Sequence, residues 1–159
     1  MAICPGCRAE GELYKACSDA ECQRHHRHFI EEAGWRENPR DELIGTLIDG
    51  EYLPIALIGE GGMGKIYKAY RMYVNQIVAL KVLKSEYMQD DTLRERFIRE
   101  AQVILQLDHP NIVKVYGCKP VPEYNTIYMA MGLLVGRSMF DILKRKVCLL
   151  YTSPSPRDS

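Results

Sequence analysis

A glycine-rich stretch over residues 58–69, Ile-Gly-Glu-Gly-Gly-Met-Gly-Lys-Ile-Tyr-Lys-Ala, constrains the fold more than any other part of the chain. Gly59, Gly61 and Gly64 have the spacing G-x-G-x-x-G, which two unrelated kinds of phosphate-binding loop share. In a dinucleotide-binding turn the last glycine opens a helix, but here branched and aromatic residues alternate after Gly64 and indicate a strand. Residues 52–58 also indicate a strand, so we predict the glycines at the tip of a hairpin. Their backbone N–H groups could then approach phosphate oxygens; an ordinary glycine-rich hairpin is the alternative.

The strand and the helix that follow each carry one charge on an apolar face. A strand over 76–83 places Lys81 on the same face as Ala79. The helix predicted over 92–107 has an apolar stripe formed by Leu93, Phe97, Ala101, Ile104 and Leu105. Glu100 falls inside that stripe. Because a buried charge without a partner is costly, we predict an ion pair between Lys81 and Glu100; two surface charges at a stripe edge are the alternative.

Four segments in this order and spacing resemble the bacterial Hanks-type serine/threonine protein kinases. They are the glycine loop, Val78-Ala79-Leu80-Lys81, Arg96-Phe97-Ile98-Arg99-Glu100-Ala101 and His109-Pro110-Asn111-Ile112-Val113. The resemblance covers about residues 47–146, which correspond to the N-terminal lobe and the start of the next lobe. It implies an α+β fold, with a five-stranded antiparallel sheet, one main helix and ATP beneath the glycine loop. By the resemblance, Lys81 holds the α- and β-phosphates and Glu100 orients it.

Two more strands complete the expected sheet, over residues 112–117 and 126–131. The resemblance makes Met131 the gatekeeper of an adenine pocket, followed by a hinge over 132–134 in which many family members carry an acidic residue at position 132. Asp141 matches an acidic residue near the ribose or the peptide substrate. The expected ATP-binding residues are Ile58, Gly59, Glu60, Gly61, Gly62, Met63, Gly64, Ile66, Ala79, Lys81, Met131, Leu133, Leu134 and Asp141.

Four cysteines crowd the first 22 residues with the spacing C-x2-C-x9-C-x4-C. They are Cys4, Cys7, Cys17 and Cys22. Four thiolates match tetrahedral zinc, and a segment this short needs a staple to fold. We therefore predict a structural zinc site in a zinc-ribbon-like module over residues 1–28. A histidine (His25, His26 or His28) in place of Cys22 is one alternative, and a disulfide or free thiols are others.

Charged residues dominate 29–49, which we predict to be a linker between this module and a kinase domain over 50–147. Trp35, the only tryptophan, could pack on the module or on the sheet. The 21 basic and 21 acidic residues balance, which argues against a nucleic-acid partner. No apolar run approaches the roughly 20 residues that span a bilayer, and the N-terminus has no secretory signal, so we expect a cytoplasmic location.

The last stretch departs from the kinase pattern. Residues 148–158 resemble the in-frame translation of a transposase sequencing adapter at every codon, so we expect 148–159 to be disordered read-through. The sequence contains neither H-R-D-x-x-x-x-N, which supplies the catalytic aspartate, nor D-F-G, which supplies a Mg²⁺ ligand. The expected parent is a kinase that uses ATP and Mg²⁺ to phosphorylate protein serine and threonine, and this fragment is expected to be inactive alone. A nucleotide-binding pseudokinase scaffold and a zinc-ribbon interaction module are the alternatives.

Overall fold

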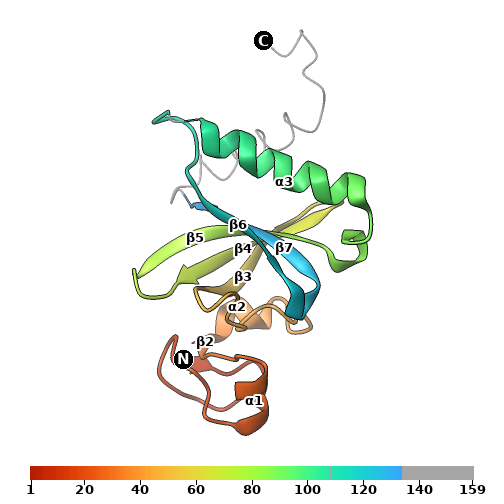
Figure 1. Ribbon diagram of the computed structural model, residues 1–159. Helices are drawn as coiled ribbons and strands as arrows, with labels where there is room; N and C mark the ends of the chain where they lie inside the picture. Colours follow the sequence, from red (N-terminus) through yellow and green to blue (C-terminus); the bar gives the residue numbers. More distant parts are fainter. Residues whose placement is uncertain (108, 134–159) are drawn as a thin grey trace.

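A computed structural model describes residues 1–107 and 109–133 (Figure 1). Its centre is a five-stranded sheet with the order β3-β4-β5-β7-β6, in which every pair of neighbours is antiparallel. The strands are β3 (Tyr52–Glu60), β4 (Gly64–Arg71), β5 (Gln76–Leu83), β6 (Val115–Val121) and β7 (Thr126–Gly132). One main helix, α3 (Asp91–Gln106), crosses one face (Figure 1). This arrangement confirms the predicted α+β fold.

The two central hairpin strands form where the alternation of side chains is clearest. β5 begins and ends at the residues predicted for it, and it pairs with β4 in unbroken register from Gly64 opposite Leu83 to Arg71 opposite Gln76. Val78 to Leu83 are all buried on this strand, which means that both faces of the sheet are covered. A strand rich in valine and leucine is suited to burial on two sides.

The main helix begins at a side-chain cap. The carboxylate of Asp90 accepts a hydrogen bond from the backbone N–H of Leu93 at 3.2 Å, and a short 3-10 turn, η1 (Ser85–Tyr87), precedes it. Phe97 and Ala101 are buried against the sheet as the predicted stripe requires. Leu105 differs from the prediction, because at 52% exposure this residue of the last turn contributes little to the core.

The fourth strand in chain order starts later than predicted. β6 runs from Val115 to Val121 rather than over 112–117, and it includes Pro120, which leads into the short turn η2 (Pro122–Tyr124). Proline lacks a backbone donor and is tolerated here because β6 is an edge strand that pairs only with β7. The strand was therefore predicted, but its bounds were placed too early in the chain.

The N-terminal part of the chain lies on the side of the sheet opposite α3 (Figure 1). It contains α1 (Ala20–Arg24), α2 (Glu32–Arg36), and a small sheet of β1 (Ala2–Ile3) and β2 (Ile30–Glu31). Residues 29–49, predicted as a charged linker, contain α2 and place Ile30, Ile44 and Ile48 in the core at 1% exposure or less. They form a packed layer, while the domain boundaries themselves stay a prediction.

Two hydrophobic clusters therefore flank the sheet. The cluster facing α3 consists of Leu83, Phe97, Ala101, Val115, Ile127 and Met129. The cluster on the outer face joins strand residues such as Leu80 and Tyr128 to the isoleucines of the N-terminal layer. No helix in the described ranges is long and apolar enough to cross a membrane. The predicted read-through at 148–159 lies outside the described residues.

Candidate nucleotide site and cysteine cluster

The glycine-rich loop forms the tip of the β3–β4 hairpin, as predicted. Ile58 to Glu60 end β3, Gly61 to Met63 cross the tip, and β4 begins at Gly64. The Gly61 N–H donates to the Gly64 carbonyl at 2.8 Å and closes the tip. A Cβ at Gly64 would lie 2.6 Å from the Val82 carbonyl, whereas one at Gly62 would meet nothing within 4 Å. The tip is thus tightly held at its base and open at its end, where a phosphate could approach the backbone.

Lys84, a residue that sequence reasoning missed, attaches the loop to the end of β5. Its backbone N–H donates to the Met63 carbonyl at 2.9 Å, and its Nζ lies 3.0 Å from Glu60 Oε1. The hydrogen bond to Lys84 lowers the pKa of Glu60, and the same bond raises the pKa of Lys84. The residue directly follows the predicted strand, but no periodicity distinguishes it from other surface lysines.

The structure brings Lys81 and Glu100 together. Lys81 Nζ lies 3.2 Å from Oε1 and 3.5 Å from Oε2 of Glu100, and 5.7 Å from the centre of the Phe97 ring. The side chains are 9% and 21% exposed. The lysine comes from the central strand β5 and the glutamate from the middle of α3, so this pair spans the gap between helix and sheet. The two charges that were out of place in the sequence satisfy each other in the fold.

The remaining predicted residues extend this face from the ion pair toward the end of β7. Ile66 is opposite Lys81, and Ala79 is opposite Met131, so these side chains share the face that carries the lysine. Leu133 directly follows β7. This face offers an ammonium beside an apolar surface, a combination that suits a planar base with an anionic tail. Two further predicted residues, Leu134 and Asp141, lie outside the described residues.

Position 132, where the family often has an acidic residue, has room for a side chain. A Cβ built at Gly132 would meet no atom closer than 3.8 Å. Its backbone N–H is held by the Lys114 carbonyl at 2.9 Å. The end of β7 is therefore held by a backbone hydrogen bond that does not depend on the side chain at position 132.

Asp41, from the predicted linker, anchors the strand that leaves the loop. Its Oδ2 accepts hydrogen bonds from Tyr67 Oη at 2.8 Å and Lys65 Nζ at 3.3 Å, and its side chain is 4% exposed. Burial raises the pKa of Tyr67, so the hydroxyl stays a donor. Sequence reasoning counted Asp41 among the charges of the linker; the mostly apolar stretch 43–48 that follows it was the available signal of burial.

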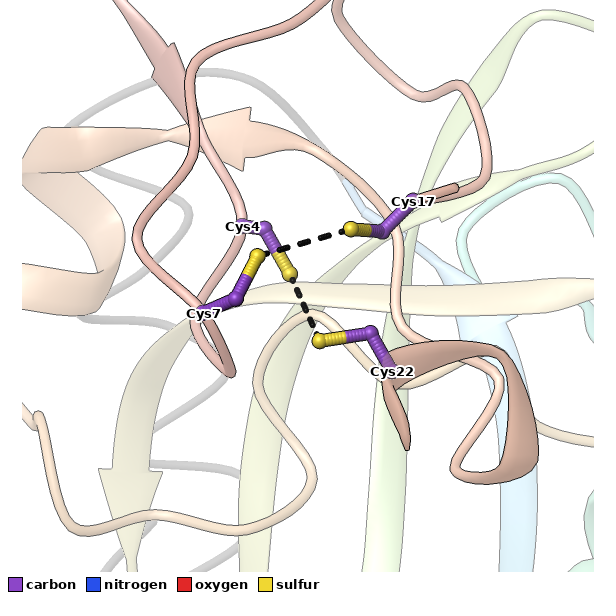
Figure 2. A group of neighbouring side chains, drawn as sticks. All are labelled: Cys4, Cys7, Cys17 and Cys22. Atoms are coloured by element: carbon purple, nitrogen blue, oxygen red, sulfur yellow. Dashed lines mark hydrogen bonds between the residues drawn. The ribbon is translucent and has the colours of Figure 1, made fainter. Parts of the chain in front are cut away.

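Four cysteine sulfurs meet on the N-terminal module (Figure 2). The sulfurs of Cys4 and Cys22, and those of Cys7 and Cys17, are 3.6 Å apart, and all four sulfurs lie within 4.8 Å of one another. A tetrahedral zinc ion with Zn–S bonds of about 2.3 Å requires sulfurs roughly 3.8 Å apart. A disulfide requires about 2 Å, so the arrangement fits a metal and not a pair of disulfides.

Local hydrogen bonds position these sulfurs. The Arg8 N–H donates to the Cys4 carbonyl at 2.8 Å and closes the first knuckle, in which a Cβ at Gly6 would lie 2.8 Å from Cys22 Sγ. The Asp19 carboxylate accepts from the N–H of Cys22 at 3.0 Å and caps α1. Burial raises the pKa of the Cys17 and Cys22 thiols, so a bound cation would be needed to favour the thiolates.

The histidines predicted as alternative ligands take other partners. His25 Nε2 lies 3.3 Å from Glu21, and His28 Nδ1 lies 2.9 Å from the His26 carbonyl. In the part of the chain that the structure describes, the group that could hold a metal consists of cysteines alone. The observed cluster favours the all-cysteine set over a mixed one.

The sheet face that carries Lys81 and the glycine-rich loop together indicate a class of protein, and comparison with known proteins identifies it. Residues 52–153, more than half of the chain, match the protein kinase domain family, and the chain belongs to that family. Serine/threonine-protein kinase pkn3 of Myxococcus xanthus is 37% identical over 106 residues, which cover 67% of this chain and 19% of pkn3. PrkC of Bacillus subtilis is 45% identical over 97 residues, 61% of this chain and 15% of PrkC.

A third relative and a solved structure come from Mycobacterium tuberculosis. Serine/threonine-protein kinase PknA is 38% identical over 105 residues, 64% of this chain and 24% of PknA. The PknI kinase domain has a TM-score of 0.48 and 30% identity, over 58% of this chain and 36% of that chain. The chain spans only about a fifth of the length of the curated relatives it matches. The relatives confirm the resemblance to bacterial serine/threonine kinases.

Proposed function

We propose that this chain supplies the ATP-binding part of a protein kinase that transfers the γ-phosphate of ATP to serine and threonine hydroxyls of protein substrates. The observation that carries the proposal is the ion pair of Lys81 and Glu100, 3.2 Å apart, on the face that also carries Ile66 and Ala79. The names of the relatives support the same activity.

The residues have distinct roles in this proposal. Lys81 binds the α- and β-phosphates, and Glu100 holds its ammonium in place, while Phe97 limits its movement from the side. The open tip at Gly61 and Gly62 presents backbone N–H groups to the phosphates. The adenine packs on an apolar surface to which Ile58, Ile66, Ala79, Met131 and Leu133 contribute; the resemblance would add Leu134 to this surface and Asp141 near the ribose or the peptide substrate. Magnesium, which kinases use with ATP, would neutralise phosphate charge through residues other than those assigned here.

Binding of a fluorescent ATP analogue to the full chain tests the nucleotide site. Lys81→Met should weaken binding at least tenfold, because no other group assigned here places a cation at the phosphates. Lys119→Met is the matched control, since Lys119 is 62% exposed on the edge strand β6 and should bind as the unchanged chain does. The proposal is wrong if the unchanged chain shows no saturable binding, or if Lys81→Met binds equally well.

We also propose that Cys4, Cys7, Cys17 and Cys22 hold a structural zinc ion. The gathering of the four sulfurs within 4.8 Å of one another, close to the spacing that a tetrahedral zinc ion requires, supports this assignment. Metal analysis of the purified chain should give one zinc per molecule. Four thiols that titrate freely in the folded chain would contradict it.

A further inference from the structure

The face of the sheet opposite Lys81 is apolar and covered. Its buried side chains include Tyr67, Val78, Leu80, Val82, Tyr128 and Ala130, none more than 4% exposed. In the described ranges the cover includes Ile30, Ile44 and Ile48, which are in the same cluster. Loss of this cover would return a large apolar surface to water, which is unfavourable.

Backbone hydrogen bonds connect the covering layer to both its neighbours. On the side of the cysteine module, Leu47 N–H donates to the His26 carbonyl at 2.9 Å, and His28 N–H donates to the Gly45 carbonyl at 2.8 Å. On the side of the sheet, Gly45 N–H donates to the Pro54 carbonyl of β3 at 2.7 Å. Residue 45 is therefore held between the module and the edge strand.

Arg27 extends this connection to a sulfur ligand. Its carbonyl accepts the N–H of Cys17 at 2.9 Å. Its guanidinium donates to the carbonyls of Glu42 and Ile44 at 3.1 and 3.2 Å. These hydrogen bonds would therefore transmit a movement of Cys17 to residues 42–44, which include the buried Ile44.

Two ring contacts join the cysteine loops to the sheet and to its cover. Tyr14, between the second and third cysteines, stacks on Tyr70 of β4 with ring centres 3.9 Å apart and planes 15° apart. Arg8, next to Cys7, lies 5.5 Å from the centre of the Trp35 ring on α2. Trp35 also packs against the outer cluster, so the only tryptophan lies at the junction of module and sheet.

The module itself has almost no core. Its buried cluster consists of Cys4, Cys17 and Cys22 together with Phe29, the first residue of the covering segment. A segment with so little apolar burial needs its metal to stay folded. The order of dependence then runs from the metal to the module, to the covering layer and to the sheet.

We propose that the cysteine module is the outer layer of the kinase lobe, so that metal occupancy at the four cysteines sets the stability of the sheet that carries Lys81 and the glycine loop. This inference rests on the proposed metal site and is independent of the proposed nucleotide binding. It makes the module and the lobe one cooperative unit instead of two domains on a linker.

Metal removal from the folded, zinc-loaded chain tests the proposal. Treatment with a chelator should reduce the hydrogen-exchange protection of β4, β5 and β7 at least tenfold, and it should shift the emission of Trp35 to the red. Added zinc should restore both signals. Cys118→Ser is the control, because Cys118 lies on β6 against the α3-side cluster and outside the group of four; it should behave as the unchanged chain.

A second variant separates contact from metal binding. Tyr14→Ala removes the stack on Tyr70 but no sulfur, so it should keep one zinc and still lose protection at β4. The inference is overturned if the chelated chain has no metal but keeps the protection of β4, β5 and β7. A chain that never binds zinc overturns the metal site as well, so the two failures are distinguishable by metal analysis.

Discussion

The two faces of the central sheet are buried by different means. The face toward α3 carries an ion pair, Lys81 with Glu100, within an apolar cluster. The buried strand residues of the outer face are closed by isoleucines from the N-terminal layer, and the ion pair on this side, Lys65 with Asp41, attaches that layer to β4. An ion pair beside an open glycine-rich loop is suited to chemistry, while a mainly apolar contact between layers is suited to stability. The face toward α3 thus carries the groups suited to function, while the outer face contributes mainly to stability.

The largest expected effect is on the charged face. In an intact kinase containing this lobe, Lys81→Met should lower phosphoryl transfer at least a hundredfold, because the phosphates lose their positioning cation. The free energy of unfolding should fall by about 1–3 kcal/mol, because the mostly buried Glu100 loses the ammonium at 3.2 Å while methionine still packs on Phe97. Kinase assays and urea titrations on the same protein measure both. If Lys81→Met lowered phosphoryl transfer only as much as its loss of folding free energy explains, the contrast between the two faces would be wrong.

The next effect belongs to the outer face. Ile44→Ala deletes a fully buried side chain and should destabilise the chain by about 2–5 kcal/mol. Val74→Ala, in the turn between β4 and β5 at 55% exposure, is the control and should be close to neutral. Urea unfolding of both variants decides whether residues 29–49 form a layer or a spacer. Equal midpoints for the two would favour a spacer.

This prediction concerns a segment whose role the sequence did not reveal. Alternation showed which side chains of 76–83 share a face and located Lys81, while helical spacing located Glu100, because both signals are local. It could not show what covers the opposite face, since Ile30 and Ile44 meet Leu80 and Tyr128 only through the fold. The charges of 29–49 concealed the mostly apolar stretch at 43–48. The predicted bounds of β6 were wrong for a related reason. A strand that pairs on one side only tolerates a proline, so Pro120 lies within it.

A smaller effect is expected where the layer is attached to the loop. Asp41→Ala leaves Tyr67 Oη and Lys65 Nζ without their acceptor and should cost about 1–3 kcal/mol. A double-mutant cycle with Tyr67→Phe should give a coupling of about 0.5–3 kcal/mol, measured from urea unfolding. Strictly additive variants would show that the outer anchor of β4 is energetically unimportant.

The smallest effect is a pH response at the loop. The bond to Lys84 lowers the pKa of Glu60 below its ordinary value of 4.5, so the pair is complete above pH 4.5 and is lost as the pH falls through the lowered pKa. The backbone amide shifts of Met63 and Lys84 should therefore titrate with a midpoint below 4.5. Glu60→Gln should abolish this transition. A midpoint at or above the ordinary value would contradict the attachment.

The hydrogen bond from Tyr124 Oη to the His25 carbonyl joins residues 99 positions apart at 3.3 Å. Closing so long a loop has an entropic cost that is met only late in folding. During synthesis the N-terminal layer leaves the ribosome before the strands that it will cover. Its isoleucines therefore stay exposed to water until those strands form. A metal that folds the first residues early would keep this layer compact during that time. The cysteines would then act first in time, before any nucleotide site exists.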